Sequence, residues 1–250
     1  MKKPLPDRLQ DLPPKWAHFC LQKDKFLKQD LGLDLGNKKL LVGFSGGVDS
    51  TALLLICKYL APSWNSEVEA AHLNHQLRPQ SGEDSTACAS FCVQNNITIE
   101  LRVHDVAKEA QASGKGLEET GRKARYAFFE DLRKRLGYDA ILLGHQLNDL
   151  AEDVFMRLMR GAGWPALGGM VAHDPGRHIL RPLLLTPKDE LQQFVQAIGA
   201  SHVEDESNTD PTFLRNRVRN QILPLFLQEN PNFLENTAQL WRQSQLDAQM

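Results

Sequence analysis

The sequence predicts an α/β protein built on a doubly wound parallel sheet of the Rossmann-like kind, with a small helical appendage toward its C-terminal end. Short apolar runs of strand length alternate with longer helical segments, and a turn with two glycines follows the first run. Helical crossovers between consecutive strands make those strands parallel. Ligands bind outside the carboxyl ends of such strands, and polar segments follow three of them here.

The apolar pattern also divides the chain. Residues 1–185 form the expected sheet domain, with 1–36 as a helical lead-in, and residues 186–250 form a small helical domain. A further helix is expected to open directly after the fourth strand, at about residue 144. The remaining expected elements are strands at 40–44, 68–73, 97–103 and 140–143 and helices at 16–27, 52–56, 83–95, 117–136, 187–198, around 215–219 and from about 232.

The composition is that of an ordinary globular protein. Of the 250 residues, 42% are apolar and 24% are charged, and no run of 18 or more apolar residues offers a membrane span. The two lysines near the start are followed by no apolar segment, so we expect a cytoplasmic protein with no membrane partner. A net charge of −2 argues against a general nucleic-acid coat protein, and any RNA contact must therefore be local.

The four cysteines do not form a metal or redox motif. None of Cys20, Cys57, Cys88 and Cys92 belongs to a Cys-x-x-Cys pair, and all lie in apolar helical contexts. We expect buried free thiols.

The turn at residues 45–50, Ser-Gly-Gly-Val-Asp-Ser, is a candidate phosphate site. It joins a strand to a helix, so the unpaired N–H groups of the first helical turn point toward the ligand edge, and two glycines let a phosphate approach the backbone. Ser45 and Ser50 can donate hydrogen bonds, whereas Asp49 needs a cation between itself and a phosphate. No lysine follows as in the Walker pattern. The alternative is an ordinary tight turn with Asp49 as a first-turn helix acid.

Polar residues also lie at the end of the second expected strand and directly after it. These residues are His72, Asn74, His75 and Arg78. A zinc site is not favoured, because a third nitrogen or sulfur ligand is missing at a suitable spacing. We expect them to line a nucleotide pocket. A hydrogen-bonded loop without a ligand is the alternative.

The long helix at 117–136 places Glu118, Arg122 and Arg125 on one face. An exposed ion pair between Glu118 and Arg122 is the ordinary interpretation of such spacing. Arginine is also the side chain best shaped to bind phosphate with two hydrogen bonds.

The segment after the fourth strand carries three carboxylates. Asn148 or Asp149 can cap the helix and Glu152 can complete a capping box, but Asp149, Glu152 and Asp153 exceed what capping needs. They can instead hold magnesium, bind an ammonium group or accept a proton from an attacking amine.

The second half of the chain is locally basic. Each of its arginines, taken singly, is most simply a solvated surface residue, but beside a nucleotide site they can together contact RNA.

The turn at 45–50 resembles the pyrophosphate loop of the N-type ATP pyrophosphatases, which cleave ATP between its α- and β-phosphates to adenylate a substrate. From about residue 39 to 232 the chain further resembles, motif by motif, the family of tRNA(Ile)-lysidine synthases. The other motifs that carry this resemblance begin at His72 (His-Leu-Asn-His-Gln-Leu-Arg), Ala124 (Ala-Arg-Tyr), Gly144 (Gly-His-Gln-Leu-Asn-Asp-Leu-Ala-Glu), Arg160 (Arg-Gly-Ala-Gly), Arg181 (Arg-Pro-Leu-Leu), Glu204 (Glu-Asp-Glu-Ser-Asn-x-Asp), Arg215 (Arg-Asn-Arg-Val-Arg) and Ile222 (Ile-Leu-Pro).

The resemblance implies an adenine nucleotide α-hydrolase-like fold and a ligase that forms a C–N bond. ATP adenylates C2 of the wobble cytidine of tRNA(Ile) with a CAU anticodon, and free lysine then displaces AMP to give lysidine. ATP and Mg²⁺ would be the cofactors. The implied residues are Ser45, Gly46, Gly47, Val48, Asp49, Ser50, His72, Asn74 and His75 for ATP, Asp49 for the metal, Arg122, Arg125, His145, Asp149 and Glu152 for catalysis, and Arg160, Arg215, Arg217 and Arg219 for tRNA.

The chain departs from the family at several points. Many members have two adjacent histidines where this chain has His145 and Gln146, and threonine where Asp153 stands. Many also carry further C-terminal domains that bind tRNA, so this chain is a short form, a truncated form or a divergent paralogue. The oligomeric state stays open, a homodimer included.

Two other functions stay open. A tRNA thiolase of the same superfamily would need a catalytic cysteine or a Cys-x-x-Cys pair, and neither is evident. A nucleotide-binding regulator that has kept the loop and lost the chemistry is the alternative from another class.

Overall fold

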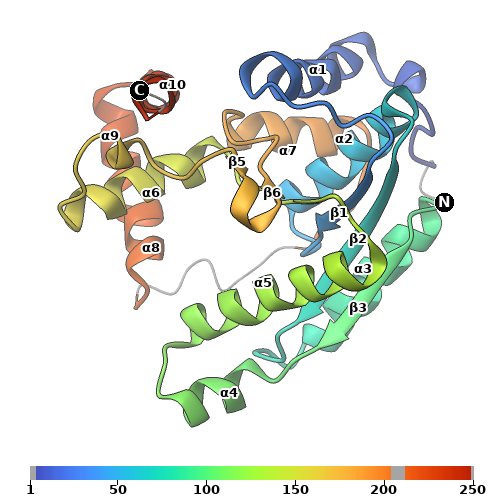
Figure 1. Ribbon diagram of the computed structural model, residues 1–250, viewed down its shortest axis with the longest axis horizontal. Coiled ribbons are helices and arrows are strands. Elements are labelled where there is room, and N and C mark those ends of the chain that lie inside the picture. Colours follow the sequence, from blue (N-terminus) through green and yellow to red (C-terminus); the bar gives the residue numbers. More distant parts are fainter. Residues whose placement is uncertain (1–3, 204–211, 249–250) are drawn as a thin grey trace.

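The computed structural model describes residues 4–203 and 212–248, and it contains a six-stranded sheet. Figure 1 shows the sheet with the helices around it. The strand order is β3-β2-β1-β4-β6-β5, and every neighbouring pair is parallel except β5 and β6. The doubly wound parallel sheet is therefore confirmed. The strands are β1 (Lys39–Gly43), β2 (Glu67–Asn74), β3 (Ile99–Val103), β4 (Ala140–Leu142), β5 (His173–Asp174) and β6 (Ile179–Leu180).

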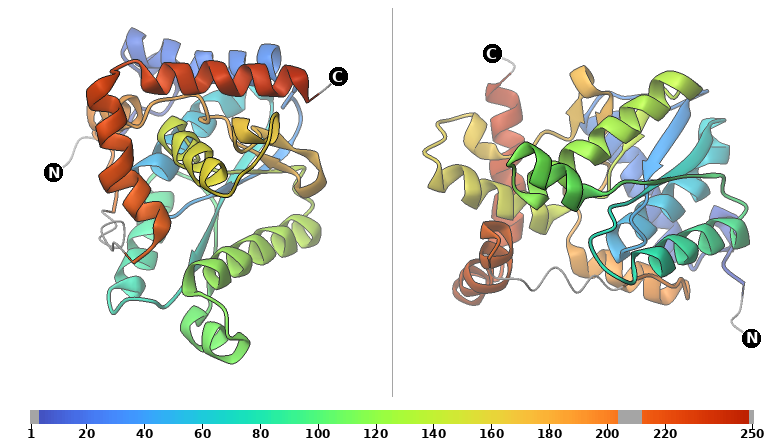
Figure 2. Two further views of the ribbon diagram at one scale, coloured as in Figure 1. Left: turned by 90° about the vertical axis from the view of Figure 1, so that its left-hand side faces the viewer. Right: turned by 90° about the horizontal axis from the view of Figure 1, so that it is seen from below.

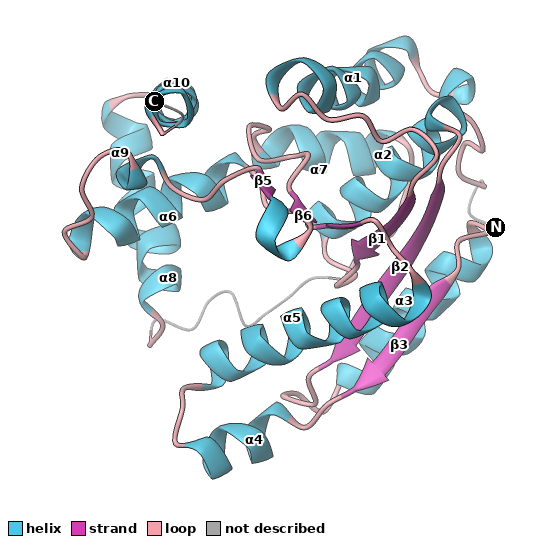
Figure 3. Ribbon diagram, in the orientation of Figure 1, coloured by secondary structure: helices cyan, strands magenta, loops and turns pink. Residues whose placement is uncertain are grey.

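Helices cover both faces of this sheet (Figure 3). The main core joins one face to four helices, and a second core joins the other face to one long helix, against whose start a shorter helix packs. The helices of the first face are α1 (Pro14–Lys25), α2 (Val48–Trp64), α3 (Ser81–Gln94) and α7 (Lys188–Ala197). Those of the second are α5 (Leu117–Leu136) and, packed on it, α4 (Val106–Ser113).

The central strand shows why the two cores form. Leu40, Leu41 and Val42 of β1 are fully buried, and alternate side chains enter opposite cores: Leu40 and Val42 one, Leu41 the other. A strand between two helical layers has no polar face, so its sequence is a continuous apolar run. That run is the signal that predicted the strand.

The remaining helices form a cluster at one side of the sheet (Figure 2). They are α6 (Leu147–Met159), α8 (Leu214–Arg217), α9 (Leu223–Glu229) and α10 (Phe233–Asp247). Phe155 of α6 meets Phe226 and Phe233 at ring-centroid distances of 4.7 and 5.6 Å. By contrast α7, assigned to the appendage from the sequence, packs on α2 within the main core. The division at residue 185 stays a prediction for the helices after α7.

Short helical turns complete the structure. They are η1 (Leu9–Asp11), η3 (Ala166–Gly168) and η4 (Pro175–Arg177), with π-helical segments η2 (Phe26–Asp30) and η6 (Val218–Ile222). Within the described ranges, no helix has the length and apolar character needed to cross a membrane.

Candidate functional site

The turn between β1 and α2 has the geometry of a phosphate-binding loop. Gly46 has φ +85°, and a β-carbon there would lie 2.8 Å from Sγ of Cys88. Gly47 is the N-cap residue of α2, a helix of 17 residues. The backbone amides and the positive end of the helix dipole therefore face the carboxyl edge of the sheet.

The two serines of this turn are held by each other. The Ser50 hydroxyl donates to the Gly47 carbonyl at 2.9 Å and lies 3.0 Å from the Ser45 hydroxyl, while the Ser45 N–H donates to Ser50 Oγ at 3.2 Å. Both hydroxyls thus sit in the concave side of the turn, where phosphate oxygens can replace these internal partners.

A pocket of about 380 Å³ opens beside this turn, at the ends of β1, β2 and β4. The sequence predicted that these three strand ends share one edge of the sheet, and the structure confirms this. The pocket is lined by Gly43, Phe44, Ser45, Asp49, Ser50, Ala71, His72, Leu73, Asn74, His75, Leu77, Arg78, Ser81, Asp84, Arg125, Phe129, Leu143, Gly144 and His145.

Asp49 lies in this pocket with an unsatisfied oxygen. Its Oδ1 is buried without a hydrogen-bond partner, and burial, with Asp149 as the next contribution, raises the pKa of Asp49 to about 6. An unpaired carboxylate beside a phosphate site is what a hard divalent cation would satisfy. No group of three metal-ligating side chains occurs among the described residues, so Mg²⁺ here would need phosphate oxygens and water as its other ligands.

The polar side chains at the end of β2 and directly after it are of two kinds: some have all their hydrogen-bond partners within the protein, and one has a free ring nitrogen. His72 Nδ1 donates to the Phe44 carbonyl at 2.9 Å and its Nε2 meets Ser85 Oγ at 3.1 Å, so both ring nitrogens are occupied within the protein. The side-chain nitrogen and the side-chain oxygen of Asn74 likewise both have hydrogen-bond partners within the protein. His75 differs: its Nδ1 is buried without a partner, and burial, with Arg125 nearby, lowers its pKa to about 4. His75 is therefore a neutral pocket-lining side chain with a ring nitrogen still available for a hydrogen bond.

The two arginines predicted on α5 occupy different places. Arg125 lines the pocket, and no ion pair or hydrogen bond links its guanidinium to any residue in 4–203 or 212–248. Burial, opposed by Tyr126 and aided by Arg122, lowers the pKa of Arg125 below its ordinary value. Arg122 is exposed and lies over the ring of Tyr126 at 5.7 Å. Of the two, Arg125 is the one placed to contact a phosphate.

His145 lines the pocket and carries a hydrogen-bond donor. The Nε of Arg181 donates to His145 Nδ1 at 3.2 Å, which leaves the proton of the neutral ring on Nε2. Burial lowers the pKa of His145 to about 3, so the ring is neutral at physiological pH. This arrangement suits binding of an anionic oxygen better than removal of a proton.

The start of α6 carries the carboxylates. Its N-cap is Gln146, whose side chain accepts from the Asn148 N–H at 2.6 Å, while Asp149 accepts from the Gln146 N–H at 3.1 Å. The alternative in which Asn148 or Asp149 caps this helix and Glu152 completes the box is wrong, because the N-cap lies two residues before Asn148 and Asp149 is the acid of the capping box.

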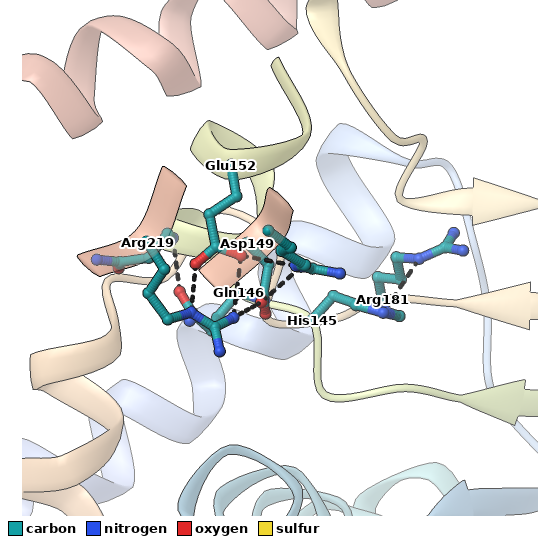
Figure 4. Close-up of polar contacts among 8 residues, drawn as sticks. His145, Gln146, Asp149, Glu152, Arg181 and Arg219 are labelled. Carbon is teal, nitrogen blue, oxygen red and sulfur yellow. Dashed lines mark hydrogen bonds and ion pairs between the residues drawn. The ribbon is translucent and has the colours of Figure 1, made fainter. Parts of the chain in front are cut away.

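Asp149 and Glu152 are paired with two arginines from the C-terminal helices (Figure 4). Arg215 donates to Asp149 Oδ1 at 2.8 Å and to Glu152 Oε2 at 2.7 Å. Arg219 donates to Glu152 Oε1 at 2.6 Å and to Asp149 Oδ1 at 3.2 Å. Glu152 is 1% exposed, so its carboxylate is shielded from water, whereas both arginine side chains stay partly exposed.

The four arginines predicted to contact tRNA are therefore not equivalent. Arg215 and Arg219 hold the carboxylates, and Arg217 donates to the Thr212 carbonyl at 2.8 Å. Arg160 is exposed at the far end of α6, roughly 16 Å from Asp149 along the helix. The acidic turn at 204–208 lies outside the described residues.

The family model for the PP-loop domain matches residues 18–226. The chain belongs to the PP-loop family. Two curated relatives are both named tRNA(Ile)-lysidine synthase: that of Nitratidesulfovibrio vulgaris is 46% identical over 87% of this chain and 62% of its own length, and that of Petrotoga mobilis is 32% identical over 91% of this chain and 70% of its own length. Within the PP-loop family, the chain therefore groups with the tRNA(Ile)-lysidine synthases.

This PP-loop protein spans less than the full length of several such relatives, covering 43% of the one from Enterococcus faecalis. Among solved structures, the U34-tRNA thiolase NcsA from Methanococcus maripaludis has a TM-score of 0.72 at 19% identity and covers 92% of this chain and 78% of its own. That likeness confirms the fold alone.

The cysteines of this PP-loop protein are free and buried, as expected. Cys88, which lies against the loop at Gly46, is 1% exposed, and burial raises the pKa of its thiol to about 12. Thiolate chemistry at neutral pH needs a lower pKa and an accessible sulfur.

Three features of the site were missed from the sequence. Arg181 fixes the tautomer of His145, and the pair between Arg78 and Asp84, at 3.1 Å, forms part of the pocket wall. A β-carbon at Gly144 would approach the Asp49 carbonyl oxygen to 3.1 Å, so glycine lets the two loops pack. A glycine directly after a strand was the available signal for this last feature.

Proposed function

We propose that the chain ligates lysine to C2 of the wobble cytidine of tRNA(Ile) with a CAU anticodon. ATP would first adenylate the cytidine and release pyrophosphate, and lysine would then displace AMP to give lysidine. The observation that carries the proposal is the junction of two unlike sites: a phosphate-binding loop with Asp49 unpaired, and beside it Asp149, close enough to raise the pKa of Asp49.

Each part of the pocket has a role in the first step. The amides of the turn at 45–50 and the hydroxyls of Ser45 and Ser50 would bind the leaving pyrophosphate. Asp49 would hold Mg²⁺, which neutralises phosphate charge when bound. Arg125 and the Nε2–H of His145 would donate to oxygens on which charge develops.

Asp149 and Glu152 would serve the second step. Only the neutral ε-amine of lysine attacks, and a neighbouring carboxylate can accept its proton. Arg215 and Arg219 occupy both carboxylates in this structure. The lysine side chain would therefore share these carboxylates with the guanidiniums or displace them, and contact of either arginine with tRNA would favour that displacement.

The relatives' names support the choice of tRNA as substrate, and buried thiols of high pKa argue against a sulfur-transfer function. A tRNA substrate places the proposed activity in the cytoplasm. The proposal does not require a homodimer.

Mass spectrometry of nucleosides from tRNA(Ile) bearing CAU, after treatment with the protein, ATP, Mg²⁺ and lysine, tests the proposal. Lysidine should form, and AMP should accumulate only with both tRNA and lysine present. Asp149→Asn should block lysidine formation. Absence of lysidine with the unmodified chain contradicts the ligase function, and incorporation of a labelled sulfur donor would support a thiolase. ATP binding without turnover would support a regulator.

A further inference from the structure

Two arginines from distant segments converge on one tyrosine at the surface. The guanidinium carbon of Arg122 lies 5.7 Å from the ring centroid of Tyr126, one turn along α5, and that of Arg177, from η4, lies 5.9 Å from the same ring. Tyr126 is half-buried and packs against the second core, whereas both arginines are exposed. The half-buried ring therefore has a guanidinium within cation–π distance from each of two segments. We call these three residues the Tyr126 platform.

The arginines of the platform lack the carboxylate partners that neighbouring cations have. The exposed pair expected between Glu118 and Arg122 does not form, although Lys123 pairs with Glu119 one residue along. Neither Arg122 nor Arg177 has an ion pair or a side-chain hydrogen bond within the part of the chain that the structure describes. Two like charges held near one ring repel each other, so an anion that binds there is favoured.

The platform adjoins the ATP pocket through both of its elements. Arg125 and Phe129, which follow Arg122 on α5, line the pocket. Arg181, four residues after Arg177, is bonded to His145 in the pocket wall. A molecule that reaches into the pocket from the surface can therefore contact the platform as well.

We propose that the Tyr126 platform binds an unpaired nucleotide of the RNA substrate next to the nucleotide that enters the pocket. This inference rests on the proposed function, which makes RNA the substrate. Proteins recognise single-stranded RNA loops by stacking bases on aromatic rings and guanidinium planes. Both guanidiniums lie within 6 Å of the Tyr126 ring centroid and both arginines are exposed, so each can offer its plane to a base and its N–H groups to a phosphate. An acidic peptide would pair with the guanidinium charges but would have no base to stack on the guanidinium planes.

The test compares two double variants of the full chain. Arg122→Gln with Arg177→Gln removes both cations of the platform, and Lys134→Gln with Arg135→Gln removes two exposed cations from the last turn of α5. Both changes lower the net charge equally. Fluorescence anisotropy measures binding of two RNA hairpins, one with an unpaired loop that carries CAU and one with the same loop made abasic beside the target cytidine.

We expect the platform variant to bind the CAU loop about tenfold more weakly than the unmodified chain, and the control variant to change binding much less. The platform variant should no longer distinguish the intact loop from the abasic loop. Its affinity for ATP should stay unchanged, which shows that the fold and the pocket are intact. Equal weakening by both double variants, or unaltered discrimination by the platform variant, overturns the proposal.

The proposed function and the platform proposal can be contradicted independently of each other. If the unmodified chain forms lysidine and the platform variant keeps the same KM for tRNA, the platform is wrong and the ligase function stands. If no lysidine forms but the platform variant alone loses loop binding, the platform stands and the reaction is a different one. If the unmodified chain does not bind the CAU loop, the platform is overturned.

Discussion

Arg219 binds Glu152 through two hydrogen bonds, from Nε to Oε1 at 2.6 Å and from Nη2 to Oε2 at 2.9 Å. Glu152 lies on α6 and Arg219 on η6, 67 residues later, so this pair joins the helix at the pocket to the C-terminal helices. Charge-assisted bidentate pairs of this kind fix geometry strongly. The position of the carboxylates at the site thus depends on a segment that is distant in sequence.

Removal of Arg219 should destabilise the fold. Arg219→Ala leaves Glu152 buried with Arg215 as its remaining partner, and we expect the free energy of unfolding to fall by about 2–3 kcal/mol. Arg219→Lys keeps the charge and loses the bidentate geometry, so its effect should be smaller. Urea unfolding monitored by circular dichroism measures both.

A double-mutant cycle provides the control for this prediction. Glu152→Gln removes the charge that loses its bidentate partner in Arg219→Ala, so the double variant should lose less stability than the sum of the single variants. Strictly additive losses would contradict a direct interaction between Arg219 and Glu152.

The ionised Asp49 carboxylate should destabilise the folded chain, and we expect it to be retained because it binds a cation. Because its pKa is raised to about 6 in the folded chain, the folded state holds its proton more tightly than the unfolded state. Stability from this group is therefore present at low pH and is lost as the pH rises from the ordinary value of 3.8 through about 6. Asp49→Asn should be more stable than the unmodified chain at pH 7, by about 3 kcal/mol.

The pH profile is the measurement that checks this sign. The advantage of Asp49→Asn, measured by urea unfolding without Mg²⁺, should be absent near pH 4 and complete above about pH 6. The variant should release no pyrophosphate. In the unmodified chain, the apparent affinity for Mg²⁺ should fall as the pH drops below about 6. A variant less stable at pH 7, or one that keeps turnover, would refute the assignment of Asp49.

Local patterns predicted most of the fold but few of the partners in the site. The helix expected at 117–136 is α5 without a change of bounds, because a long amphipathic pattern is specific. The two-residue strands β5 and β6 carry no detectable period, and the eight-residue α4 is too short for one. Asp149 and Glu152 were identified as candidates, but their pairing with Arg215 and Arg219 depends on tertiary packing between distant helices.

Arg181 should act as a positioning residue for His145. Its Nε donates to Nδ1 of His145, so Arg181→Met removes the bond that selects the Nε2–H tautomer, and it also removes a nearby charge that lowers the pKa of His145. We expect nitrogen NMR shifts of His145 to show a mixture of tautomers and the adenylation rate to fall by about tenfold. Arg181→Lys cannot reproduce the Nε contact and should behave similarly. A single unchanged tautomer in Arg181→Met would contradict this role.

Gly46 should be intolerant of a β-carbon for two separable reasons. Its φ of +85° strains any other residue, and a β-carbon would lie 2.8 Å from Sγ of Cys88. Gly46→Ala should therefore cost more than the strain alone, with an expected loss of about 2–4 kcal/mol. Gly114→Ala is the matched control, because Gly114 has φ +66° and no atom within 4 Å of the added carbon.

A second variant separates the contact from the strain. Adding Cys88→Ala to Gly46→Ala removes the sulfur that the new β-carbon would meet, so the double variant should recover part of the loss that exceeds the Gly114→Ala value. Thermal unfolding measures stability, and ATP binding reports on the loop itself. If Gly46→Ala and Gly114→Ala lose the same stability and ATP binding is unchanged, close packing of Cys88 against the phosphate loop does not constrain the site.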